Sequence, residues 1–279
     1  MIKKISAIIK IIRPLNFLIV IFSVLVSALI CVNATYSMPV ILAAAFSAAF
    51  AASAGNFIND IFDVEIDKWN RPNRPLPAKL LSIKNAKNLY VLFIAFSLVL
   101  AYIVNITAFV IALCANIILF FYSYIFKSVP LLSNFVVALM TGLAFLYGGI
   151  AVDNIGCSFI PAVFAFLING MREIVKDMED VTGDSLNKIY TFPQRKGYLA
   201  SKYLILFMGV FLIAATIFPF IIKLYKIEYF VIIMVFVNPL IVFSIKKLFD
   251  DHSRNNLRKI SFLLKLNMIF GLTAIYLGK

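Results

Sequence analysis

Three aspartates, Asp60, Asp63 and Asp67, are spaced three and four positions apart at the end of a long apolar segment. Because an α-helix turns by about 100° per residue, this spacing predicts that the three carboxylates lie on one helix face. Asn56 and Asn59 would lie beside them. A row of carboxylate and amide oxygens is the kind of donor set that binds a hard divalent cation.

The same spacing returns in Asp177, Asp180 and Asp184, and Glu173 extends that row by one turn. Close carboxylates repel one another unless cations lie between them, most strongly near lipid. Mg²⁺ suits such a site because it binds oxygen and commonly joins a few carboxylates to substrate phosphates. We therefore expect a Mg²⁺ and diphosphate site at a membrane face, the alternative being that both rows are solvated helix ends.

Basic segments follow the two acidic motifs. Residues 68–77 contain Arg71, Arg74 and three prolines, and residues 190–197 are expected to form a second basic loop. Arginine binds phosphate oxygens through its planar fork of donors, although each of these charges could instead serve membrane topology. Lys127, at the end of an apolar segment, has the same two interpretations.

Composition indicates a membrane protein, since 63% of the 279 residues are hydrophobic and 14% are charged. The net charge of +13 does not indicate nucleic-acid binding, because the basic residues are separated by apolar spans. Cys31, Cys114 and Cys157 lack metal-ligand spacing, and His252 is the only histidine. Neither the cysteines nor the histidine therefore supports zinc or thiol catalysis.

The expected fold is all-α, with about nine transmembrane helices in a single membrane-embedded domain over residues 1–279. Windows of about 20 apolar residues mark a span. They occur near residues 15–33, 38–58, 88–105, 107–126, 132–152, 157–175, 201–222, 227–246 and 260–277.

Lysine and arginine set the orientation of these spans. The N-terminal segment and the loops on its side carry 23 of the 26 basic residues, and the opposite side carries Lys223, Lys226 and Lys279. Because cytoplasmic loops are enriched in Lys and Arg, we expect the N-terminus and both acidic motifs to lie on the cytoplasmic side of the cell membrane. The motifs end the second and sixth spans, which run in the same direction, so they can meet at the same depth.

The motifs together resemble a known family, the UbiA superfamily of intramembrane prenyltransferases. The matching residues, in chain order, are Asn59-Asp60-x-x-Asp63-x-x-x-Asp67, Asn70-Arg71-Pro72-x-Arg74-Pro75, Tyr124-x-x-Lys127 and Asp177-x-x-Asp180-x-x-x-Asp184. The resemblance implies nine helices around a central cavity that opens to lipid and is capped by cytosolic loops. It also implies Mg²⁺-dependent transfer of a prenyl group from an isoprenoid diphosphate.

The resemblance assigns roles by position. Asn59, Asp63, Asp67, Asp177, Asp180 and Asp184 would hold Mg²⁺, with Asp60 and Glu173 as auxiliaries. Arg71, Arg74, Tyr124 and Lys127 would contact the diphosphate, and Asn56 and Asn59 are also expected to bind substrate.

The residues around the second motif resemble one branch of the superfamily, the archaeal digeranylgeranylglyceryl phosphate synthases. That branch implies geranylgeranyl transfer to the hydroxyl of geranylgeranylglyceryl phosphate, which forms the second ether bond of archaeal membrane lipids. Arg172 and Lys176, or Lys79 and Lys84, are then candidates to bind the acceptor phosphate.

Two other functions remain open at this point. An aromatic prenyltransferase of quinone, heme or chlorophyll biosynthesis would use the same donor site with a different acceptor. A transporter of ions or lipid phosphates is the more distant alternative, because its acidic residues would be expected near mid-bilayer with access from both faces. The sequence makes no prediction about the oligomeric state.

Overall fold

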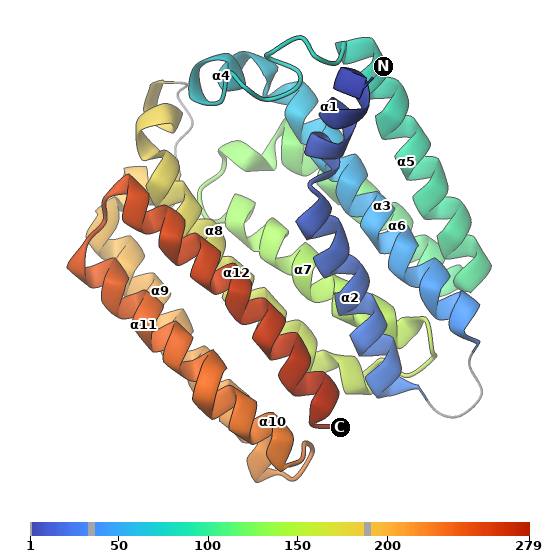
Figure 1. Ribbon diagram of the computed structural model, residues 1–279, viewed down its shortest axis with the longest axis vertical. Coiled ribbons are helices and arrows are strands. Elements are labelled where there is room, and N and C mark those ends of the chain that lie inside the picture. The colour runs from blue at the N-terminus through green and yellow to red at the C-terminus, as the bar shows by residue number, and fades with distance from the viewer. Residues whose placement is uncertain (1, 33–36, 187–190) are drawn as a thin grey trace. The chain divides into compact units, whose positions relative to one another are not determined.

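The computed structural model describes residues 2–32, 37–186 and 191–279, and these residues form helices and their connections without a β-strand (Figure 1). Within this part of the chain, nine helices are long and apolar enough to cross a membrane. The prediction of an all-α, multi-pass membrane protein is confirmed.

Each of the expected spans is present. The spans are α2 (Pro14–Cys31), α3 (Met38–Phe62), α5 (Ile83–Val104), α6 (Ile106–Tyr124), α7 (Leu132–Ile150), α8 (Phe159–Leu186, preceded by the 3₁₀ turn Gly156–Ser158), α9 (Phe192–Ile221), Ile227–Asp250 and α12 (Arg254–Leu277). The eighth consists of α10 (Ile227–Ile232), a π-helical turn (Ile233–Val237) and α11 (Asn238–Asp250). Two further helices, α1 (Ile2–Ile12) and α4 (Val64–Asn70), are too short to span.

The prediction of a loop over residues 190–197 is wrong for the described part of that segment. Helix α9 begins at Phe192, and Thr191 and Gln194 form a capping box at its first turn. This arrangement satisfies two backbone N–H groups that would otherwise lack partners. The helix is kinked at Gly197, whose φ of 82° is accessible to glycine at little cost. Tyr190 lies outside the described residues.

The chain divides into two compact units, residues 1–127 with 144–158 and residues 128–143 with 159–279. In the first unit, α3 packs against α1, α2, α5 and α6. Small side chains occupy these contacts, among them Ala44, Ala45 and Ala49 of α3 and Ala101 of α5. Small residues allow membrane helices to approach closely, so α3 is held on several sides and its acidic end has a fixed position within this unit.

Two further features of the first unit are close fits. Asn105 is the only residue between α5 and α6. Its side-chain oxygen accepts a hydrogen bond from the Ala108 N–H at 2.7 Å, and its side-chain amide donates to the Ile150 carbonyl at 3.2 Å. At Gly148 of α7, a Cβ atom would lie 2.5 Å from the Val24 carbonyl oxygen. Only glycine permits this approach.

In the second unit, α8 packs against α9 and α12, and α11 packs against the same two helices. The face of α8 that enters this bundle carries Met171, Ile174, Val175 and Met178, all of them buried. These residues repeat every three or four positions, as one face of a helix does. The acidic residues of α8 therefore occupy a different face from the one that forms the hydrophobic core.

Candidate active site

The first acidic motif spans a break between two helices. Helix α3 ends at Phe62, Asp63 has φ −85° and ψ 0°, and α4 begins at Val64. The expectation of one continuous helix face over Asp60, Asp63 and Asp67 is therefore wrong. The backbone bonds from the Asp63 N–H to the Asn59 carbonyl (2.9 Å) and from the Asp67 N–H to the Asp63 carbonyl (2.8 Å) nevertheless keep the three aspartates close to helical register.

All three carboxylates of this motif are buried, with Asp60, Asp63 and Asp67 exposing 4 to 5% of their surface. Burying a carboxylate is costly unless it is paired and hydrogen-bonded. The surrounding side chains must therefore supply positive charge.

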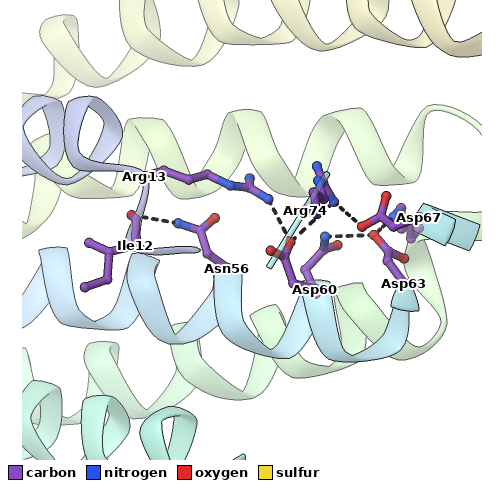
Figure 2. A network of polar contacts seen from close by, with 9 residues as sticks. Ile12, Arg13, Asn56, Asp60, Asp63, Asp67 and Arg74 are labelled. Atoms are coloured by element: carbon purple, nitrogen blue, oxygen red, sulfur yellow. Dashed lines mark hydrogen bonds and ion pairs between the residues drawn. The ribbon is translucent and has the colours of Figure 1, made fainter. Parts of the chain in front are cut away.

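Arginine and lysine side chains supply that charge (Figure 2). Arg74 lies between two carboxylates, with Nη1 2.5 Å from Asp67 Oδ2 and 3.4 Å from Asp60 Oδ1. Arg13 donates from Nη2 to Asp60 Oδ1 at 3.0 Å. Lys127 forms an ion pair with Asp63. Each acidic side chain of the first motif thus has a cationic partner, and the assignment of Arg74 and Lys127 to the diphosphate stays a prediction.

The two asparagines of the motif have different partners. Asn59 donates to the Oδ2 atom of Asp63 at 2.9 Å, the same oxygen that pairs with Lys127. Asn56 donates instead to the Ile12 carbonyl at 3.3 Å, at the end of α1. Asn59 is therefore part of the carboxylate cluster, whereas Asn56 attaches the end of α1 to α3.

Two opposing effects act on Asp67, which lies in α4 outside the spans. Burial raises the pKa of its carboxyl above the ordinary value, and the Arg74 guanidinium opposes that shift without cancelling it. Asp63 and Asp60 add smaller contributions that also raise the pKa. The carboxylate form of Asp67 thus depends on Arg74.

The segment after α4 places Arg74 by anchoring its own ends in the hydrophobic core. Leu76 and Leu81 are buried in a cluster with Ala7, Ile11 and Phe57. Arg74 accepts a backbone hydrogen bond from Ala78, which closes a turn over the proline-rich segment. The prolines prevent a helix here, and the two leucines fix the turn against α1 and α3.

Arg71 and Tyr124 occupy different surroundings from Arg74 and Lys127. Arg71 is exposed at the end of α4. Tyr124 is 62% exposed, and its ring lies 5.6 Å from that of Phe62 and 6.3 Å from that of Phe120. Their assignment to the diphosphate therefore remains a prediction.

The second acidic motif lies on the continuous helix α8. Asp177 accepts a hydrogen bond from Nδ2 of Asn134, at the start of α7, over 2.8 Å. Asp180 follows one turn later, and Asp184 lies in the last turn of α8 with a side chain outside the described part of the structure. Glu173 accepts from Arg172 Nη1 at 2.9 Å and from Lys176 Nζ at 2.6 Å.

Helices α9 and α12 hold the end of α8. Tyr198 Oη donates to the Met178 carbonyl at 3.2 Å, and Gln194 Nε2 donates to the Val181 carbonyl at 3.0 Å. Arg258 Nε donates to Glu179 at 2.6 Å. The first two bonds tie the last turns of α8 to α9 and fix the turn that carries Asp180.

Sequence reasoning did not identify Arg13 or Asn134 as site residues. Arg13 was counted among the topology charges, although it has a φ of 57° at the joint between α1 and α2. Asn134 is 5% exposed, and it follows Leu131, which has a φ of 64°. A positive φ at a residue other than glycine is uncommon and often marks a functional constraint, but that signal exists only in a structure.

The donor atoms of both motifs are oxygens, as Mg²⁺ prefers. Among the described side chains, no three Asp, Glu, His or Cys residues gather into a ready metal cage. Mg²⁺ is commonly bound by one or two carboxylates, with water and substrate phosphates completing the shell. The pairs of oxygen donors present in each motif fit that mode of binding.

Comparison with known proteins decides the family. The model of the UbiA prenyltransferase family matches residues 20–269. This chain belongs to the UbiA prenyltransferase family. Its curated UbiA relatives include the digeranylgeranylglyceryl phosphate synthase of Methanosphaera stadtmanae, 30% identical over 97% of this chain and 98% of the relative. The synthase of Thermococcus kodakarensis is 35% identical over 81% of this chain and 80% of the relative.

Solved UbiA structures share the fold. A structure described as digeranylgeranylglyceryl phosphate synthase in membranes superposes with a TM-score of 0.80 at 30% identity, covering 99% of this chain and 98% of that one. A UbiA homologue from Archaeoglobus fulgidus, bound to DMAPP and Mg²⁺, superposes with a TM-score of 0.67 at 21% identity, covering 96% of this chain and 98% of that one. At that identity the second likeness concerns the fold alone.

Proposed function

We propose that this chain transfers a geranylgeranyl group from geranylgeranyl diphosphate to the free hydroxyl of geranylgeranylglyceryl phosphate. The observation that carries the proposal is its similarity, over nearly the whole chain, to relatives that bear the name of that synthase. Membership of the UbiA prenyltransferase family supports the reaction class. The buried carboxylates and their cationic partners at the end of α3 support the use of a charged leaving group.

The leaving diphosphate must be neutralised as its bond to the prenyl carbon breaks. In this proposal Asn59, Asp63, Asp67, Asp177, Asp180 and Asp184 would hold Mg²⁺. When bound, Mg²⁺ supplies positive charge that stabilises the departing diphosphate. The proposal rests on the oxygen donors of the two motifs and on their matched spacing.

The cations of the first unit act on the diphosphate directly. Arg74 and Lys127 exchange their carboxylate partners for phosphate oxygens when the donor binds, because a diphosphate carries more charge than a carboxylate. They then stabilise the charge that develops on the leaving oxygen. Arg13 remains on Asp60 and keeps that carboxylate neutralised while Arg74 moves.

Breaking of the carbon–oxygen bond leaves an allylic cation that the acceptor hydroxyl attacks at C1. The hydroxyl proton leaves to a carboxylate of the site or to the released diphosphate. Water must be kept away from this cation, and an apolar setting at the end of a membrane helix serves that purpose.

We further infer that the N-terminus and the acidic motifs face the cytoplasm. The support is the unequal distribution of basic residues, 23 against 3, on the two sides of the spans. A single cysteine introduced at Lys68, in a chain without its native cysteines, should react with an impermeant thiol reagent only after the cell membrane is opened. Labelling of intact cells at this position would contradict the orientation.

The function is tested by incubating radiolabelled geranylgeranyl diphosphate with geranylgeranylglyceryl phosphate or with hydroxybenzoate, with and without Mg²⁺. We expect Mg²⁺-dependent transfer to the lipid phosphate, whereas transfer only to the aromatic acceptor would overturn the proposal. Asp63→Asn and Asp180→Asn should each lower kcat/KM by about 100-fold or more. Near-normal turnover in both variants would remove the metal-site assignment. Asp250→Asn, which alters an exposed carboxylate at the end of α11, is the matched control.

A further inference from the structure

Helix α8 carries ionisable residues inside its membrane-spanning segment as well as at its end. Arg172, Glu173 and Lys176 lie within the span Gly156–Val181, and their side chains are 16%, 13% and 36% exposed. Ionisable groups within a membrane helix are costly, and they commonly mark a substrate or ion site. The sequence makes Arg172 and Lys176 candidates to bind the acceptor phosphate.

Two cations in this group share one carboxylate oxygen. Oε1 of Glu173 accepts from both Arg172 and Lys176. The Nε atom of Arg172 is buried and has no hydrogen-bond partner among the described residues. A buried guanidinium donor without an acceptor is unusual, and it indicates that an acceptor atom belongs there.

The group is placed for a ligand that reaches toward the carboxylates of α8. At about 100° per residue, Lys176 lies between Arg172 and Asp180 around the helix, about 40° from each, whereas Asp177 lies about 140° from Arg172. At a rise of about 1.5 Å per residue, Arg172 lies about 7.5 Å along the axis from Asp177 and about 12 Å from Asp180. An acceptor held at Arg172 by its phosphate end can therefore place its hydroxyl near Asp180 of the same helix.

Resting on the proposed function, we propose that Arg172 and Lys176 bind the phosphate monoester of the acceptor, which displaces Glu173 from the two cations. A phosphate monoester carries about −1.5 to −2 charges near neutral pH, so it can replace a carboxylate that carries one. Its oxygens can accept from Nε and Nη of arginine together. An aromatic carboxylate carries one charge, as Glu173 does, so charge does not favour its displacing Glu173 from the two cations.

The other cationic candidates fit this role less well. Lys79 and Lys84 are both exposed to solvent, and Lys79 has a φ of 55° in the turn before α5. Exposed lysines hold a phosphate weakly because water competes for it and salt screens it. The semi-buried pair on α8 is therefore assigned the acceptor phosphate.

The test measures binding without turnover. Geranylgeranylglyceryl phosphate is titrated onto the full chain in detergent with EDTA and no donor, beside its dephosphorylated alcohol. Arg172→Gln and Lys176→Gln should weaken binding of the phosphate by about 10- to 100-fold and leave binding of the alcohol unchanged. Glu173→Gln should tighten binding of the phosphate, because it removes the competing carboxylate. Arg258→Gln, which removes another arginine paired with a glutamate of α8, should change neither affinity.

Several outcomes would overturn the subsite. They are an unchanged phosphate affinity in Lys176→Gln, an equal loss for phosphate and alcohol, and weaker phosphate binding in Glu173→Gln. Competition by phosphatidylglycerol as strong as that by the acceptor would assign the group to bilayer headgroups instead. Lys176 is the more exposed cation, so its variant keeps the test informative if Arg172→Gln does not fold.

The subsite and the proposed function fail separately. If the binding pattern holds and no prenyl transfer is found, the function is wrong and the phosphate subsite stands. If transfer proceeds and neither variant raises KM for the acceptor, the subsite is wrong and the function stands.

Discussion

Replacing Arg74 by glutamine should destabilise the protein in a manner that depends on pH. Arg74 joins Asp67 and Asp60, whose side chains are 7% and 6% exposed. The substitution leaves Asp60 paired with Arg13, whereas Asp67 loses its cation. The effect of the substitution should therefore arise mainly at Asp67.

The expected magnitude follows from burial. Removing one partner of a fully buried ion pair costs about 3–5 kcal/mol. The Arg74 side chain is 20% exposed, and solvent screening reduces that figure to about 2–3 kcal/mol. Asp67→Asn should cost less, about 1 kcal/mol, because it removes the buried charge together with its hydrogen bond. The double variant should cost less than the sum of the two, since the two side chains interact directly.

The sign of the pH dependence follows from the raised pKa of Asp67. Burial favours the protonated form in the native state, so the native protein binds a proton at a pH at which the unfolded chain has released it. The free energy of unfolding contributed by Asp67 therefore falls as the pH rises through that window. Arg74→Gln removes the charge that opposes this shift, so it should raise the pKa of Asp67 in the native state further. The loss of unfolding free energy caused by the substitution should therefore be larger near about pH 8 than near about pH 5.5.

The assay is equilibrium unfolding of the chain in mixed detergent micelles with EDTA, for the wild type, both single variants and the double variant. Arg258→Gln is the control, because its side chain is 58% exposed. A loss below about 0.5 kcal/mol for Arg74→Gln, unchanged between the two pH values, would refute the buried pairing of Arg74 with Asp67.

Three other predictions concern the donor site and the packing of the first unit. Lys127→Gln should raise KM for the donor diphosphate by about 10-fold or more, and steady-state kinetics with unchanged KM and kcat would count against its role. Removing Mg²⁺ with EDTA should abolish prenyl transfer and be reversed by added Mg²⁺, whereas residual turnover in EDTA would argue against metal dependence. Gly148→Ala should lower stability by about 1–3 kcal/mol because its Cβ would meet the Val24 carbonyl. Gly271→Ala, where a Cβ has open space, should be neutral or stabilising in the same unfolding assay.

Local patterns in the sequence account for most of the fold. The spans could be predicted because an apolar stretch of bilayer length has few alternatives to a helix. The two acidic motifs could be found because their spacing matches the helical repeat. The family resemblance singled out Arg74 and Lys127 as contacts of the diphosphate, and the structure pairs both with carboxylates of the first motif.

Contacts between distant residues could not be predicted in this way. Arg13 reaches Asp60 across 47 positions, and Asn134 reaches Asp177 across 43. Such pairs depend on how whole helices pack, and a single sequence does not encode them locally. The helix break at Asp63 was missed because neither glycine nor proline marks it. Its one local signal is that aspartate is favoured where a helix begins.

The single residue between α5 and α6 has a consequence for how the protein enters its membrane. Two spans joined by Asn105 alone leave no connecting segment to be carried across the bilayer by itself. They should therefore insert together as a helical hairpin, with the Asn105 side chain accepting from the Ala108 N–H in the first turn of α6. An epitope placed between them would lengthen this tip, and we expect it to impair biogenesis well before it impairs chemistry.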